Sequence, residues 1–172
     1  MTREEAVRRI ESAADEKLMK LDLSGLNLEE VPSEIVKFTH LTELNLRNNQ
    51  ISQIPDAIRQ LSNLTKLYLC NNQISQIPDA IGQLSNLTSL VLRNNQISQI
   101  PDTIGQLSNL GLIDFSNNQI SSIPDAMEQL SKLQGLNLSN NKIASRPEWL
   151  RGRMFERTWV WLYNNQIPPN DD

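Results

Sequence analysis

A pattern of leucine and asparagine, L-x-x-L-x-L-x-x-N-x-I, returns along most of the chain and limits what the chain can fold into. Its asparagines fall at Asn49, Asn72, Asn95, Asn118 and Asn141, each 23 residues after the one before. A fixed period of this length is typical of repeat proteins, in which each repeat forms one coil and buries its apolar side against its neighbours. The sequence therefore predicts a single elongated domain without a separate globular core.

Within each copy, the leucines alternate with variable residues over a few positions. In the copy that begins at Leu41, Leu44 and Leu46 alternate with outward residues, as a short β-strand requires. We expect strands of successive coils to pair in parallel and to line the inside of a horseshoe. The expected fold class is α/β: a solenoid with a concave parallel β-sheet, short helical turns on its convex side and an N-terminal capping helix.

The return half of each coil carries a proline. These prolines are Pro32, Pro55, Pro78, Pro101, Pro124 and Pro147. Proline suits the first position of a helical turn, and the aspartate that follows it in most copies complements the positive end of that turn. We expect one short α or 3₁₀ turn per coil. The aspartates do not predict a cation site, because one carboxylate per coil cannot converge on one ion.

The asparagine column predicts a structural ladder inside the coils. After each strand the chain turns sharply and leaves backbone groups that a side-chain amide can satisfy. The ladder comprises Asn49, Asn72, Asn95, Asn118, Asn141 and Asn165. The last interval is 24 residues, which indicates one inserted residue in the final coil.

The first residues predict a short helix over residues 2–16. Thr2 and Glu5 fit a capping box, in which each side chain satisfies a backbone N–H at the helix start. The apolar face comprises Ala6, Ile10 and Ala13, with Val7 and Ala14 at its edges. We expect residues 1–17 to close the open end of the solenoid as a cap. About seven coils, the first beginning at Leu18, should then span residues 18–167, with a flexible tail over 168–172.

The last coil departs from the others. Arg146 stands before Pro147 where the other copies have an aliphatic residue. The return segment is filled by Trp149, Leu150, Met154 and Phe155. The stretch from Trp159 to Tyr163 predicts a final strand, with Val160 and Leu162 pointing inward.

Charge and motif content exclude several functional classes. The net charge of -4, without a basic run, argues against nucleic acid as a partner. Phosphate-binding and dinucleotide-binding glycine loops are absent. His40 and Cys70 are the only residues of their types, which excludes two-histidine zinc motifs and intrachain disulfides. We expect no enzymatic activity, no cofactor and no metal.

The ends of the chain bear on its location. The N-terminus is charged where a signal peptide would be apolar, and no apolar run approaches the roughly 20 residues that span a membrane. We expect a cytoplasmic monomer that does not bind membranes.

The outward positions of the strands are the candidate functional residues, because they vary while the inward positions hardly change. Tyr68, Val91 and Leu112 are apolar or aromatic, lie on three successive strands and have charged neighbours, which resembles a protein interface. The alternative is a set of scattered exposed residues. The predicted partner-binding residues are Arg47, Lys66, Tyr68, Val91, Arg93, Leu112, Asp114, Trp159 and Trp161. For the two tryptophans, the alternative is end-capping or a junction to a further segment.

The coils over residues 41–156 closely resemble 23-residue leucine-rich repeats with the L-P-x-x-I return segment. Residues 21–35, after an Ala/Ile/Arg-rich helix, are similar to the start of bacterial, notably cyanobacterial, Roco-type proteins. In that family the repeats precede a Ras-like GTPase domain. This chain has no GTPase motif, so the resemblance implies a recognition or regulatory region and no GTPase activity.

These observations favour a protein–protein interaction scaffold that binds an unknown protein partner through its concave face. Two alternatives stay open. One is the N-terminal recognition region of a larger Roco-type signalling GTPase. The other is a structural repeat array without a dedicated partner.

Overall fold

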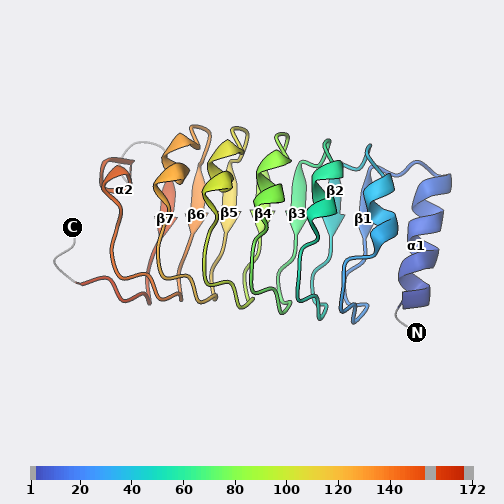
Figure 1. The fold of residues 1–172 in the computed structure, drawn as a ribbon, viewed down its shortest axis with the longest axis horizontal. Coiled ribbons are helices and arrows are strands. Elements are labelled where there is room, and N and C mark those ends of the chain that lie inside the picture. The colour runs from blue at the N-terminus through green and yellow to red at the C-terminus, as the bar shows by residue number, and fades with distance from the viewer. Residues whose placement is uncertain (1–2, 154–157, 169–172) are drawn as a thin grey trace.

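The computed structural model describes residues 3–153 and 158–168, in which seven strands form one parallel sheet in chain order. Figure 1 shows the coils in a row, with α1 at the N-terminal end and α2 and β7 at the other. The strands are β1 (Lys20–Asp22), β2 (Glu43–Asn45), β3 (Lys66–Tyr68), β4 (Ser89–Val91), β5 (Leu112–Asp114), β6 (Gly135–Asn137) and β7 (Trp159–Trp161). The predicted parallel sheet is confirmed.

Neighbouring strands pair with an offset of one repeat, so equivalent residues of successive coils stack in columns. Leu44 pairs with Leu67, and Leu67 pairs with Leu90. Between β6 and β7 the offset grows by one, and Leu136 pairs with Val160. The inserted residue of the last coil is therefore taken up in the return segment, and the sheet keeps its register.

The return segments form 3₁₀ turns, as the proline–aspartate pairs predict. The turns are η1 (Ser33–Lys37), η2 (Asp56–Gln60), η3 (Asp79–Gln83), η4 (Asp102–Gln106) and η5 (Asp125–Gln129). Each begins directly after its proline, whose fixed φ suits the start of a helical turn. The last return segment is instead an α-helix, α2 (Glu148–Arg153), and its Leu150 is buried in the core.

The core runs the length of the solenoid as stacked aliphatic columns. Leu44, Leu67, Leu90, Ile113 and Leu136, at equivalent positions of five strands, are completely buried. Each is covered by the coil before it and the coil after it. A coil therefore depends on its neighbours for burial, as a quasi-one-dimensional array requires.

The N-terminal helix α1 (Arg3–Asp15) covers the open side of the first coil. Ala6, Ile10 and Ala13 are buried in the continuous core, whereas Ala14 is exposed, so Ala14 does not belong to the apolar face. Val7 is half-buried at the edge of that face. The predicted cap thus presents a narrow, small-residue face to the coil.

The expectation that Leu18 begins the buried set of the first coil is wrong. Lys17 takes the left-handed conformation at φ 50°, and the backbone N–H groups of Leu18 and Lys17 donate to Ala13 and Ala14. This pairing is a Schellman motif, which ends a helix by reversing the chain. Leu18 is thereby used to terminate α1, and its side chain stays 40% exposed.

Some predicted features lie outside the described residues. Thr2 of the capping box, Met154 and Phe155 of the last return segment, and most of the tail, at residues 169–172, are among them. Glu5, the other residue of the box, forms ion pairs with Arg8 and Arg9 one turn further along α1. The division into residues 1–17, 18–167 and 168–172 stays a prediction.

Candidate interaction surface on the concave sheet

Residues on either side of the inward leucines point out of the sheet and form the concave surface. Tyr68 and Val91 are paired across β3 and β4, and Val91 is paired in turn with Asp114 on β5. Leu112 pairs with Ser89, one column away. A shallow groove of about 510 Å³ is lined by these residues together with Arg47 and Arg93, and by Asn48, Cys70 and Asn71.

Arg47 and Tyr68 contact each other on this surface. The Arg47 guanidinium carbon lies 4.1 Å from the centre of the Tyr68 ring, within cation–π distance. Both side chains are half-buried, and Arg47 Nε is shielded from solvent without a hydrogen-bond partner. The arginine is therefore held in place while one of its N–H donors is left unused.

Val91 does not form the exposed centre that the sequence predicts. Its side chain is only 9% exposed, whereas Leu112 is 44% exposed. A short β-branched side chain between Tyr68 and Asp114 is covered by its neighbours, so Val91 forms the floor of the groove. The accessible apolar surface consists of Leu112 and part of Tyr68.

Leu112 rests over a glycine on the next strand. A Cβ atom added to Gly135 would lie 2.9 Å from Leu112 Cδ1 and 3.9 Å from Trp161 Cζ3. The missing side chain at Gly135 therefore makes room for Leu112. Gly135 was not among the residues singled out from the sequence.

Charged residues surround the apolar part of the groove. Lys66 and Arg93 are exposed, and Asp114 is half-buried. Asp114 Oδ1 accepts hydrogen bonds from the backbone N–H of Ser116 at 3.1 Å and from its hydroxyl at 2.7 Å. At the N-terminal end of the same face, Lys20 Nζ and Glu43 Oε2 form an ion pair at 3.4 Å.

A side-chain hydrogen bond that recurs at the ends of the strands is missing from the central coils. In four coils the outward residue at the end of the strand accepts a hydrogen bond from the backbone N–H two residues later. The acceptors are Asp22, Asn45, Asp114 and Asn137. Tyr68 and Val91 occupy this position in β3 and β4, as Trp161 does in β7, and offer no such acceptor. The break in this column of Asp and Asn residues was the signal that could have marked these coils from sequence.

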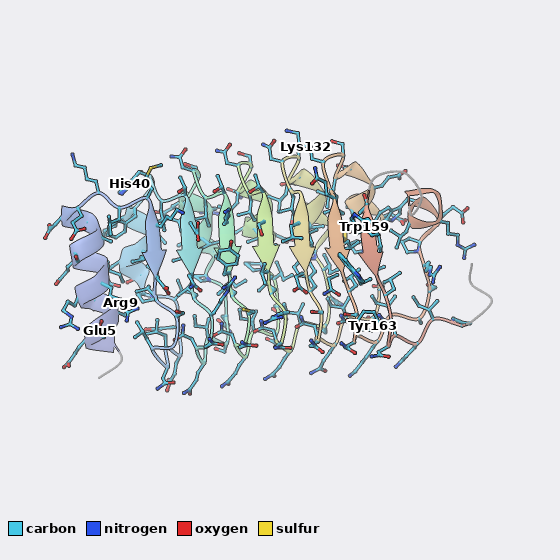
Figure 2. The ribbon with its side chains drawn as sticks, turned by 180° about the vertical axis from the view of Figure 1, so that it is seen from behind. Glu5, Arg9, His40, Lys132, Trp159 and Tyr163 are labelled. Carbon is cyan, nitrogen blue, oxygen red and sulfur yellow. The ribbon has the colours of Figure 1, made fainter. Side chains whose placement is uncertain are left out.

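A second aromatic patch comprises Trp159 and Trp161 on β7 and Tyr163 just after it, and these side chains are 74%, 42% and 58% exposed. Figure 2 labels Trp159 and Tyr163 at this end of the sheet. Val160 and Leu162 point inward but are only half-buried, whereas their counterparts Leu136 and Leu138 are completely buried. The C-terminal end of the described core is therefore less covered than the N-terminal end.

The asparagines of the predicted ladder make the same set of bonds in every coil. Asn118 Nδ2 donates to the carbonyl oxygens of Leu92 and Phe115 at 3.0 Å each, and its Oδ1 accepts from the N–H of Ile97 at 3.0 Å. The Leu92 oxygen also accepts from Asn95 at 2.9 Å. Between the ends of the ladder, each such carbonyl accepts from two asparagines, whereas the backbone N–H of Ile97 has one ladder asparagine as its acceptor. The ladder thus joins each coil to the one before it.

A second asparagine column was missed as a structural feature. The residue before each ladder asparagine has a positive φ of 55–57°. The members are Asn48, Asn71, Asn94, Asn117, Asn140 and Asn164, and Gly25, with φ 69°, is their equivalent in the first coil. Asparagine tolerates the left-handed region better than other side-chain-bearing residues. The repeated Asn-Asn pair in the sequence was the available signal.

Catalytic and metal-binding groupings do not emerge in the described part of the chain. No group of three or more His, Cys, Asp or Glu residues there could hold a metal ion. Cys70 is buried, and His40 is half-buried beside Phe38 at a ring distance of 6.0 Å. Burial raises the pKa of Asp22, but hydrogen bonds from Ser24 and the charge of Arg9 outweigh it, so that this pKa is lowered overall.

The order of the strands, the 3₁₀ return turns and the asparagine ladder together define the family. The family profile described as leucine rich repeat matches residues 16–74, 62–110 and 85–143, which cover most of the chain. The chain is a leucine-rich repeat protein. Stacked repeats of this kind create extended concave surfaces that serve binding. No curated protein gives a significant sequence match.

Solved leucine-rich repeat structures are similar to this protein over most of its length. A leucine-rich repeat protein of Leptospira interrogans is 35% identical, with a TM-score of 0.80 over 84% of this chain and 37% of its own. An internalin (inlF) of Listeria monocytogenes is 29% identical, with a TM-score of 0.71 over 81% of this chain and 40% of its own.

The third is the ectodomain of the Arabidopsis thaliana receptor kinase GASSHO1/SCHENGEN3, solved in complex with CASPARIAN STRIP INTEGRITY FACTOR 2. It is 32% identical, with a TM-score of 0.73 over 80% of this chain and 17% of its own. The leucine-rich repeat protein described here thus spans less than half the length of each of the three. No helix among its described residues is long and apolar enough to cross a membrane.

Proposed function

We propose that this leucine-rich repeat protein recognises a protein partner through the concave surface over β2–β5. The main observation behind the proposal is that Tyr68 and Val91 replace the Asp or Asn found at the same position in four other coils. Four other coils use this position to satisfy a backbone N–H, and these two coils carry side chains that shape the groove instead. Loss of a stabilising bond in the middle of a regular array is typical of a functional site.

Two further features support the same surface. Leu112 is 44% exposed and lies over Gly135, and the Arg47 guanidinium is stacked on the Tyr68 ring. An exposed apolar residue, an aromatic residue and an arginine are the types that contribute most to protein–protein binding. The similar plant ectodomain was solved in complex with CASPARIAN STRIP INTEGRITY FACTOR 2, and its fold resembles that of this chain.

The test uses a partner recovered from the host by affinity capture. Tyr68→Ser combined with Leu112→Ser should weaken binding by at least about 2 kcal/mol, the usual hot-spot threshold. Val91 is left unchanged because it is buried. The control, Asp56→Asn with Asp102→Asn, alters exposed residues of the convex turns. Normal binding by the concave variant, with loss of binding by the convex variant, would show that the working face is wrongly assigned.

We propose a wider context from the start of the chain. The resemblance of residues 21–35 to Roco-type proteins favours a recognition region of a signalling GTPase in the cytoplasm. A phosphate-binding loop encoded downstream in the same gene would support this, and a gene without one would leave a stand-alone binding protein. We also propose that residues 1–17 are the N-terminal cap of the solenoid of residues 18–167.

A further inference from the structure

The concave surface carries a local excess of positive charge in a protein whose net charge is -4. Arg47, Lys66 and Arg93 lie over β2–β4, and no carboxylate among the described residues forms an ion pair with them. Glu43, the nearest acidic residue in the sheet register, is paired with Lys20 at 3.4 Å. Three cations are thus left available for an acidic ligand.

Arg47 is the best prepared of these cations. Its guanidinium carbon lies 4.1 Å from the Tyr68 ring centre, and its Nε is shielded from solvent, so a ligand meets the terminal Nη1 and Nη2 groups. A guanidinium fixed against a ring loses little freedom when it binds a planar carboxylate through two parallel N–H bonds. The geometry at Arg47 therefore favours contact with a carboxylate of the ligand and disfavours contact with an apolar group.

Arg93 occupies the equivalent position two strands further on. Strands of a sheet lie about 4.8 Å apart, so the backbones at Arg47 and Arg93 are separated by about 10 Å. An extended peptide that rises about 3.3 Å per residue covers this distance in about three residues. Between and beside the arginines lie Tyr68 and Leu112, which offer apolar contact.

We propose that the groove over β2–β5 binds an extended acidic segment of the partner protein. Two carboxylates on the same side of the segment, two or four residues apart because its side chains alternate, bind Arg47 and Arg93. An apolar side chain between them or next to them on that side packs on Tyr68 and Leu112. Asp114, at the far side of the groove, disfavours a third carboxylate there and sets the direction of the segment. This inference rests on the function proposed above and specifies the chemistry of the ligand.

The experiment selects ligands from random sequences, so the partner need not be identified first. A phage-displayed library of random dodecapeptides is panned on the purified full chain and in parallel on an Arg47→Met, Arg93→Met variant. Methionine keeps much of the side-chain length that packs on Tyr68 while removing the charge. Arg59→Met, an exposed arginine of the convex turn η2, is the matched control. Thermal melting establishes that all three proteins are folded.

Peptides enriched on the wild-type protein should carry paired Asp or Glu residues next to a large apolar residue. Synthetic copies should bind the double variant at least about tenfold more weakly, since a bidentate charged bond contributes about 1.5–3 kcal/mol. The Arg59→Met control should bind them normally. Binding should weaken as salt is raised.

Three results would overturn the inference, and they differ in what else they refute. If the enriched peptides lack acidic residues and do not bind the Tyr68→Ser variant, the acidic ligand is refuted, whereas binding at the concave face is supported. Peptides that bind the wild type and all concave variants equally, or no enrichment at all, would refute both. Displacement of the peptide by an equal concentration of a thymidine 20-mer would assign the arginines to nucleic acid.

Discussion

Replacing Asn118 by alanine tests the role of the ladder asparagines separately from the role of the left-handed asparagines that precede them. The change removes one acceptor and three donated bonds, to the carbonyl oxygens of Leu92, Phe115 and Ser116. The Ser116 oxygen keeps the bond from the backbone N–H of Asn94. The Leu92 and Phe115 oxygens each keep the bond from a second ladder asparagine, at 2.9 Å and 3.0 Å. The N–H of Ile97 loses the acceptor that the ladder provides. The damage is therefore concentrated on one buried N–H.

The magnitude follows from those bonds. An unsatisfied buried N–H costs about 1–3 kcal/mol, and each lost donated bond costs about 0.5–1.5 kcal/mol at most, because its carbonyl stays paired. Asn118→Ala should lower the free energy of unfolding by about 2–4 kcal/mol. Asn118→Gly should cost at least as much, because glycine supplies no acceptor and adds backbone freedom.

Asn117 provides the matched control on the neighbouring residue. It is exposed and has a φ of 55°, so Asn117→Ala should cost about 1–2 kcal/mol from the left-handed backbone alone. Asn117→Gly should recover most of that loss, because glycine adopts this conformation freely. Urea titration of the four variants measures the differences. If glycine rescued position 118, or failed to rescue position 117, the two columns would not have the roles assigned to them.

Four further outcomes are expected. Gly105→Ala should lower stability by about 1–3 kcal/mol in urea titration, because its Cβ would lie 2.4 Å from a backbone oxygen of the next turn, and unchanged stability would refute that close packing. Deletion of residues 1–17 should lower the melting temperature and produce larger species in light scattering; an unchanged monomer would mean that α1 is no cap. Hydrogen exchange should be faster in β7 than in β6, because its inward residues are half-buried; equal protection would contradict the uncovered end. Arg9 and Arg8 lower the pKa of Glu5, and the pKa of Asp22 is lowered as well. These two carboxylates therefore stabilise the fold above their unfolded-state pKa values, and this stability is lost as the pH falls. Glu5→Gln with Asp22→Asn should flatten the fall in melting temperature between about pH 7 and 3, and an equally steep fall would exclude these groups as the cause.

The repeating part of the structure could be predicted from the sequence because its constraints are local and recur many times. Leu44 and its equivalents lie on one side of a short strand wherever the alternation appears, and each proline–aspartate pair begins a 3₁₀ turn. An error in one coil would have been exposed by the others. The fold class and the parallel sheet were therefore predictable.

The ends and the groove could not be predicted in the same way, because each occurs once. Leu18 matches the repeat pattern, yet its backbone is used to end α1, and no second copy reveals the conflict. Val91 was predicted to be exposed because it points out of the sheet. Its burial depends on the size of the side chains around it, which the pattern does not specify. The stacking of Arg47 on Tyr68 likewise depends on two neighbouring coils together.

The central claim is that the partner lies against the concave face, and site-specific photo-crosslinking in the host tests it most directly. A photoreactive benzoylphenylalanine at Leu112 should produce a crosslinked species with the partner, because this side chain is 44% exposed in the groove. The same group at Asp102, which is exposed on the convex turn η4, should produce none. A crosslink that forms from position 102 and is absent from position 112 would contradict the assignment of the concave face.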